Sequence, residues 1–151
     1  NNNISLPIVK KRYLLYLNPI GGQGTAMKCW KKVENLFINK NSFVEIEKFY
    51  TDYYRHAYDN TLNIKDNNMY QGIICCSGDG IIHEVINAIM ERDRINNEFW
   101  DIPVGVIPAG TSNALAKTLV NNAESYDLNE ENINLYYQQY PGMNYTCLNK
   151  F

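Results

Sequence analysis

The feature that most constrains this chain is a strand, a glycine-bearing turn and a helix in succession, which occurs three times. The turns are Asn18–Gly24, Ser77–Gly80 and Gly110–Asn113, and each follows a short apolar run. After each turn, apolar residues recur at intervals of three and four, which is typical of an amphipathic helix. This alternation of strands and helices predicts an α/β fold with a parallel sheet covered by helices.

The segments between these turns fit the same fold. The alternating pattern of 43–51 predicts a strand with one solvated face, and 53–66 suits a helix. The first helix is expected to place Trp30 in the core. The helix over 80–92 is expected to bury one stripe of side chains, formed by Ile82, Val85, Ile86, Ile89 and Met90.

Composition excludes several classes of function. The length of 151 residues fits one domain, and a net charge of −2 without a basic block predicts no nucleic-acid partner. No apolar run approaches the roughly 18 residues of a membrane-spanning helix. The four cysteines form no CxxC pair. The adjacent Cys75 and Cys76 end an apolar run, which predicts small buried side chains in a reducing compartment, so we expect a cytoplasmic protein.

The three turns predict a site for a polyphosphate. In a parallel sheet they lie at the same carboxyl edge, where ligands bind. Each turn offers unpaired N–H groups at the beginning of a helix, and glycine lets the backbone approach an anion. None of the turns is a Walker A loop or a GxGxxG motif. The alternative is that the glycines only make tight connections between strand and helix.

Asp79, between two glycines, has two interpretations. It could be the N-cap of the helix over 80–92. It could instead face a transferred phosphoryl group, as the base for an incoming hydroxyl or as a ligand of Mg²⁺; other metal ligands cannot be assigned. Glu84, one turn further, either favours the beginning of the helix or hydrogen-bonds a nucleotide. His83 is interpreted as a partly exposed packing residue.

These motifs resemble a known family. The segments NPIGGQGTA, SGDGIIHEVINAIMER and IPAGTSNALAKTL are together similar to the catalytic domain of lipid kinases of the diacylglycerol kinase superfamily, over roughly residues 12–120. The stretches His83–Val85 and Met90–Arg92 make the chain most similar to the sphingosine kinases. The segment TDYYRHAYD, residues 51–59, also resembles that branch.

The resemblance implies a three-layer nucleotide-binding domain of the diacylglycerol kinase and NAD kinase type. It implies an ATP-dependent kinase that uses Mg²⁺ to phosphorylate a sphingoid base, with Asp79 as the base. We expect this domain in 1–141. Residues 142–151 would be the first strand of a second, truncated domain, a β-sandwich that holds the lipid and contacts the membrane. The implied nucleotide-binding residues are Asn18, Gly21, Gly22, Gly24, Thr51, Ser77, Gly78, Gly80, Glu84, Gly110, Thr111, Ser112 and Asn113.

The chain departs from the family pattern at two turns. The first loop of the family often carries basic residues where this chain has Ile20, Gln23 and Thr25. Backbone N–H groups and Lys28 or Arg55 would then have to neutralise the phosphates. The third turn has a serine, Ser112, in place of a glycine.

Three other functions remain open. The chain could belong to a diacylglycerol or ceramide kinase, because the nucleotide half does not choose the lipid. It could be a non-catalytic nucleotide-binding module, which the altered first loop favours. An NAD kinase, which uses a Gly-Gly-Asp-Gly turn, agrees less well with the segment HEVINAIMER.

Overall fold

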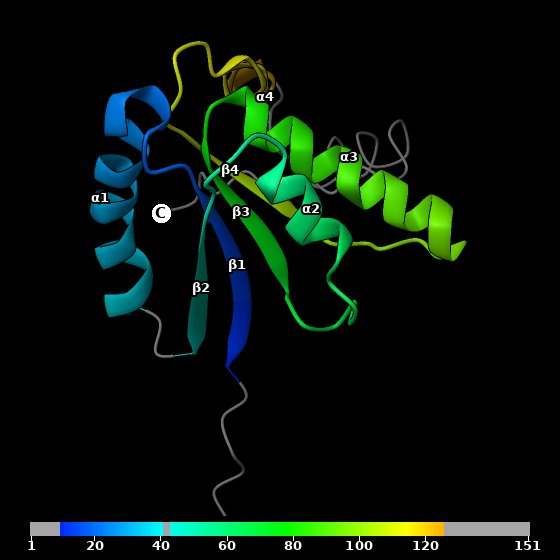
Figure 1. Cartoon of the computed structure of the whole chain (residues 1–151). Helices are drawn as coiled ribbons and strands as arrows, with labels where there is room; N and C mark the ends of the chain where they lie inside the picture. The colour runs from blue at the N-terminus through cyan, green and yellow to red at the C-terminus, as the bar shows by residue number, and fades with distance from the viewer. Residues whose placement is uncertain (1–9, 41–42, 126–151) are drawn as a thin grey trace, which may run out of the picture.

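The computed structural model describes residues 10–40 and 43–125, and Figure 1 shows their arrangement. The strands are β1 (Lys11–Leu17), β2 (Val44–Tyr50), β3 (Gly72–Ser77) and β4 (Val104–Pro108). The helices are η1 (Gly21–Gly24, a 3-10 turn), α1 (Thr25–Lys40), α2 (His56–Leu62), α3 (Asp79–Asn96) and α4 (Ala114–Ser125). All pairings in the sheet are parallel, in the order β2-β1-β3-β4. The predicted parallel α/β fold is therefore confirmed.

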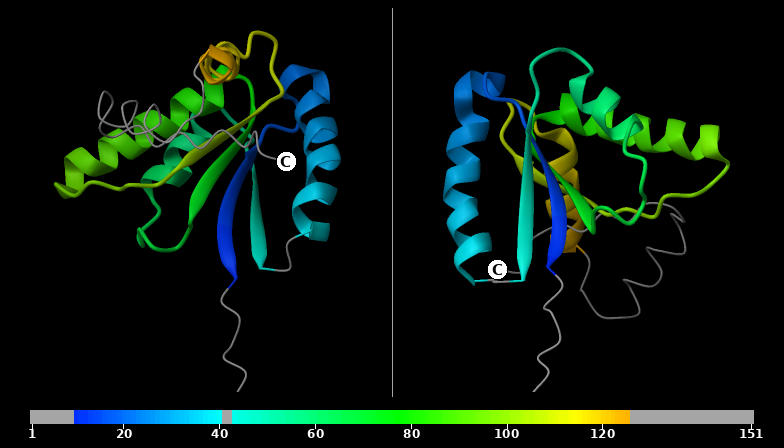
Figure 2. Two further views of the ribbon diagram at one scale, coloured as in Figure 1. Left: turned by 180° about the vertical axis from the view of Figure 1, so that it is seen from behind. Right: turned by 60° about the horizontal axis from the view of Figure 1, so that its bottom comes forward.

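Helices cover both faces of the sheet, which makes three layers. Helix α1 lies on one face, and α2 and α3 lie on the other (Figures 1 and 2). Successive residues of β1 alternate between these faces. Leu15 packs in the cluster that contains Trp30 of α1, whereas Leu14 packs with Val85 of α3. Trp30 is 1% exposed, so its predicted place in the core is confirmed.

The central strand β3 is buried along its whole length, as is typical of a parallel sheet covered on both faces. Cys75 faces the α2–α3 layer and Cys76 faces α1. Burial raises the pKa of both thiols, to about 12 for Cys76, where the nearby Cys29 adds to the effect. Both side chains are therefore neutral, small and apolar, as predicted.

Two expectations from the sequence are corrected by the structure. The helix expected over 53–66 is only His56–Leu62, because Arg55 adopts a left-handed conformation with φ 71° and begins the helix late. In α3, Met90 is 64% exposed rather than buried. The buried residue of that turn is Arg92, whose guanidinium donates to the Ile64 carbonyl and lies 4.2 Å from the ring centre of Trp100.

The second predicted domain is not described by the structure. The boundary between 141 and 142 and the strand expected in 142–151 both lie outside the described residues. Within the described ranges, no helix is both long and apolar enough to cross a membrane.

Candidate functional site

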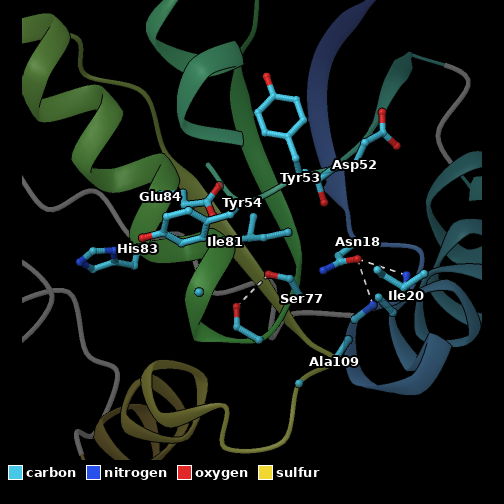
Figure 3. A pocket seen from close by; sticks show the side chains of 16 residues that line it. Asn18, Ile20, Asp52, Tyr53, Tyr54, Ser77, Ile81, His83, Glu84 and Ala109 are labelled. Atoms are coloured by element: carbon cyan, nitrogen blue, oxygen red, sulfur yellow. Dashed lines mark hydrogen bonds between the residues drawn. The ribbon is translucent and has the colours of Figure 1, made fainter. Parts of the chain in front are cut away.

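A cavity of about 660 Å³ lies at the carboxyl edge of the sheet, and all three glycine turns contribute to it. A volume of this size is typical of small-molecule sites. Figure 3 shows Asn18 and Ile20 on one side of the cavity and Tyr54, His83 and Glu84 on the other. The predicted site residues that line it are Asn18, Gly21, Thr51, Ser77, Gly78, Gly80, Glu84 and Gly110.

The first turn is held by hydrogen bonds between its own residues. The side-chain oxygen of Asn18 accepts hydrogen bonds from the backbone N–H groups of Ile20, at 3.1 Å, and Gly21, at 3.0 Å. A Cβ atom on Gly21 would lie 2.9 Å from Cγ of Asn18, so a side chain there would displace the Asn18 side chain that accepts these bonds. Gly24 has φ 79°, a conformation that favours glycine. Asn18 thus shapes the loop and also lines the cavity.

The second and third turns are packed against each other. A Cβ atom on Gly110 would lie 2.4 Å from Cα of Gly78, which leaves no room for a side chain. The side chain of Asn113, at φ 50°, accepts from the Gly110 N–H and donates to the Gly110 carbonyl, both at 2.8 Å. Gly110 is therefore required by its contact with Gly78, independently of any ligand, whereas a Cβ atom on Gly78 would make a tight contact of 3.2 Å with Cα of Gly110.

Asp79 connects these two turns. Its carboxylate accepts hydrogen bonds from the backbone N–H groups of Ala114, at 3.0 Å, and Leu115, at 3.2 Å, the first two residues of α4. The N-cap of its own helix α3 is Gly78, which has no side chain to cap with. Of the two interpretations of Asp79, the N-cap of the helix over 80–92 is therefore wrong, because the carboxylate caps α4 instead.

Gly22 belongs to η1 and directly follows the lining residue Gly21. Other predicted site residues lie beside the cavity rather than on it. Gly24 ends η1, before α1. Asp79 lies between two residues that line the cavity, Gly78 and Gly80, but its carboxylate is directed to α4. The residues 111–113 form the connection from Gly110 to α4, where Asn113 closes the turn.

The wall opposite the glycine turns is formed by the segment after β2. Thr51 is buried, and its N–H donates to the Leu17 carbonyl at the end of β1, at 2.9 Å. Sequence reasoning predicted Thr51 but missed Asp52, Tyr53 and Tyr54, which also line the cavity. Their place directly after the carboxyl end of a strand was the signal that could have found them.

The fixed charges on the lining are acidic. Among the described lining residues, the charged side chains are Asp52 and Glu84, and neither Lys nor Arg is present. The guanidinium of Arg55 lies 4.0 Å from the ring centre of Tyr58, and Lys28 is exposed on α1. The expectation that Lys28 or Arg55 neutralises phosphates is therefore not met by the lining itself.

The described residues contain no group of three His, Cys, Asp or Glu side chains that could hold a metal ion. Magnesium usually needs less than that, since it binds through one or two carboxylates together with substrate phosphates and waters. Asp79 fits such a role as a single carboxylate, because each of its oxygens retains a free lone pair beside the bond to α4.

Comparison with known proteins identifies the family. A family model described as the diacylglycerol kinase catalytic domain matches residues 12–137. The chain belongs to this family. A crystal structure of a diacylglycerol kinase from Bacillus anthracis superposes on this diacylglycerol kinase catalytic domain with a TM-score of 0.56, covering 76% of this chain and 38% of that one. The two sequences are 23% identical, so this likeness shows the fold alone.

The diacylglycerol kinase catalytic domain described here has curated relatives with higher identity. It is 38% identical to sphingosine kinase 2 of Arabidopsis thaliana, covering 74% of this chain and 22% of that protein. It is 36% identical to sphingoid long chain base kinase 4 of Schizosaccharomyces pombe, covering 70% and 22%. Sphingosine kinase 2 of Homo sapiens is 34% identical, with 70% and 16% covered. The chain thus spans about a fifth of the length of such relatives.

Proposed function

We propose that this chain is the nucleotide-binding half of an ATP-dependent kinase that phosphorylates a sphingoid base. The observation that carries the proposal is the cavity at the carboxyl edge, lined by all three glycine turns in a chain of the diacylglycerol kinase catalytic family. The choice of a sphingoid base over other lipids is supported by the relatives named sphingosine kinases, at 34 to 38% identity. We also propose a cytoplasmic protein that meets its lipid at a membrane surface.

In this proposal the phosphates lie against the turns and the nucleoside lies against the opposite wall. Helices α1, α3 and α4 all begin at the same edge of the sheet (Figure 1). The positive ends of their dipoles favour an anion there, although the first two N–H groups of α4 already donate to Asp79. The wall with Tyr53 and Tyr54, exposed by 57% and 85%, offers aromatic faces to a planar base. Ile20, 83% exposed, offers an apolar contact across the cavity.

Asp79 would accept the proton of the incoming hydroxyl. Its two N–H partners on α4 hold the carboxylate in one orientation, and its neighbours Gly78 and Gly80 line the cavity. Positioning contributes most of the rate in phosphoryl transfer, because the transition state is loose and little covalent chemistry falls to the protein. A carboxylate fixed between two glycine turns meets that requirement.

The phosphate charge would be balanced by Mg²⁺ bound with the nucleotide. The acidic lining supplies no cation among the described residues, so a divalent ion is the charge that the proposal needs. When bound, such an ion polarises the phosphoryl oxygens and stabilises the negative charge that develops on them. In its alternative role, Asp79 would hold this ion instead of accepting the proton.

The same lining favours one alternative, a nucleotide-binding module without catalysis. A cavity without a basic side chain binds phosphates more weakly. The two proposals differ in what they require of Asp79. A kinase loses turnover when this carboxylate is removed, whereas a binding module keeps its nucleotide affinity and has no turnover to lose.

The decisive experiment is phosphate transfer from ATP in the full-length protein, with sphingosine, diacylglycerol and ceramide as parallel substrates. We expect transfer to sphingosine that depends on Mg²⁺ and falls in the Asp79→Asn variant. Transfer to diacylglycerol or ceramide in preference to sphingosine would contradict the proposed substrate. Nucleotide binding without transfer to any lipid would instead favour the binding module.

A further inference from the structure

The segment Asp52–Arg55, of which Asp52, Tyr53 and Tyr54 line the cavity, is hydrogen-bonded to helix α3. The backbone N–H of Arg55 donates to Oε1 of Glu84 at 3.0 Å, although the two residues are 29 positions apart in the chain. Tyr53, Tyr54 and Glu84 all line the cavity. The hydrogen bond therefore connects one lining segment to another.

The turn that this bond holds is unusual in its backbone. Arg55 has φ 71° and ψ 10°, the left-handed region that residues with a side chain rarely adopt. Such a conformation persists only where surrounding contacts impose it. Arg55 is also the N-cap of α2, where its carbonyl accepts the N–H of Asp59 at 2.9 Å. Its backbone is thus fixed on one side by α2 and on the other by Glu84.

The other contacts of the turn join it to α2 and, through Thr51, to β1. The N–H of Asp52 donates to Nδ1 of His56 at 3.0 Å, and the ring of Tyr53 stacks on that of His56 with centres 4.2 Å apart. Thr51 is held to β1 through Leu17. These contacts shape the beginning and the middle of the turn. The hydrogen bond from Arg55 to Glu84 connects the end of the turn to α3.

We infer that Glu84 is a positioning residue, which fixes the turn Asp52–Arg55 so that Tyr53 and Tyr54 form the wall of the cavity. The inference rests on the proposed function in placing a nucleotide against that wall. Without the Glu84 oxygen, the Arg55 N–H loses its partner and the left-handed conformation loses a restraint. The turn then relaxes away from the cavity, and the nucleotide loses a contact surface.

The test uses two substitutions of Glu84 and one matched control in the full-length protein. Glu84→Gln keeps a side-chain oxygen that can accept the Arg55 N–H, whereas Glu84→Ala removes it. Glu91→Ala is the control, since Glu91 lies seven residues further along α3 and pairs with Arg94 outside the cavity. Hydrogen exchange of the peptide 51–58 is measured without nucleotide, and MgATP affinity is measured by calorimetry.

We expect Glu84→Ala to speed exchange of this peptide about tenfold without nucleotide and to weaken MgATP about tenfold. Glu84→Gln should keep the exchange rate of the parent protein and should not weaken MgATP, since the cavity only loses a negative charge. Glu91→Ala should stay close to the parent protein in both measurements. Unchanged exchange in Glu84→Ala would overturn the inference even if MgATP binding weakened, because Glu84 would then act by direct contact. Faster exchange with unchanged MgATP affinity would support the anchoring and contradict the nucleotide placement of the proposed function.

Discussion

The first glycine turn differs from the other two in what holds it. The turn Asn18–Gly24 is shaped by its own residues, through the Asn18 side chain and the positive φ of Gly24. The turns at Gly78 and Gly110 are shaped by each other, through backbone contact and through the bonds from Asp79 to α4. Three turns that look alike in sequence therefore depend on different interactions.

This difference shows two distinct structural reasons why glycine occupies these positions. In the first turn, glycine satisfies a local backbone geometry. In the paired turns, it lets two loops touch that are about 30 residues apart in the chain. A third reason, close approach to a ligand, remains testable only at glycines that neither constraint explains. Gly80 is such a position, because a Cβ atom there would meet nothing within 4 Å.

The largest effect is expected from Gly110→Ala. The new Cβ would lie 2.4 Å from Cα of Gly78, and a backbone atom cannot move aside as a flexible side chain can. We expect the free energy of unfolding to fall by about 3 kcal/mol, measured by chemical denaturation.

Gly24→Ala is the matched variant in the first turn. Its nearest contact would be 3.9 Å away, so only the positive φ opposes the change. A loss of about 1 kcal/mol is expected there. If both variants lost the same free energy of unfolding, the contact between the second and third turns would not make Gly110 more sensitive to substitution than Gly24.

The next largest effect is expected from Asp79→Asn, on turnover. Asn keeps one oxygen for the N–H groups of α4 but cannot accept a proton, so the thermal midpoint should stay within a few degrees while turnover falls roughly 10²-fold. Lipid phosphorylation and thermal unfolding of the full-length protein measure the two. If the Asp79→Asn protein were fully active, Asp79 would have no catalytic role and would only cap α4.

The sequence predicted the local parts of this structure well and the long-range parts poorly. Strand positions and the three turns follow from apolar periodicity and glycine placement, which are local signals. The partner of Asp79 was missed because Ala114 lies 35 residues away, on a helix whose docking depends on the sheet order. Met90 was assigned to the core because the 3.6-residue stripe includes it. Arg92 lies outside that stripe and was not assigned to the core, although it is buried. Packing of Arg92 on Trp100 overrides that stripe.

The candidate site was likewise predicted where local sequence signals mark it and missed where long-range contacts form it. Glycine turns marked one side of the cavity, since their residue types carry a known backbone requirement. The opposite wall, at Tyr53 and Tyr54, carried no such signal, because tyrosines are as common in packing as in binding. The bond from Arg55 to Glu84 depends on a left-handed residue that no propensity favours.

A smaller effect is expected from Asn18→Ala in the first turn. It removes the acceptor of two backbone N–H groups and should lower the free energy of unfolding by about 1 kcal/mol. Asn18→Asp keeps an acceptor in place and should unfold like the parent protein, yet weaken MgATP because it adds a negative charge to the cavity. If Asn18→Asp also lowered the free energy of unfolding, the turn would depend on more than this side-chain oxygen.

The smallest effect is expected from Gly80→Ala, and it tests the remaining reason for glycine. Gly80 is in the first turn of α3, has no positive φ and has free space where a Cβ would be. Alanine should therefore stabilise the helix by about 0.5–1 kcal/mol. Gly80 also lines the cavity, so a methyl group there would hinder a phosphate that approaches the backbone closely. We expect higher stability together with weaker MgATP binding, measured by denaturation and calorimetry on one preparation. Higher stability with unchanged affinity would place the phosphates away from this turn, nearer to the first one.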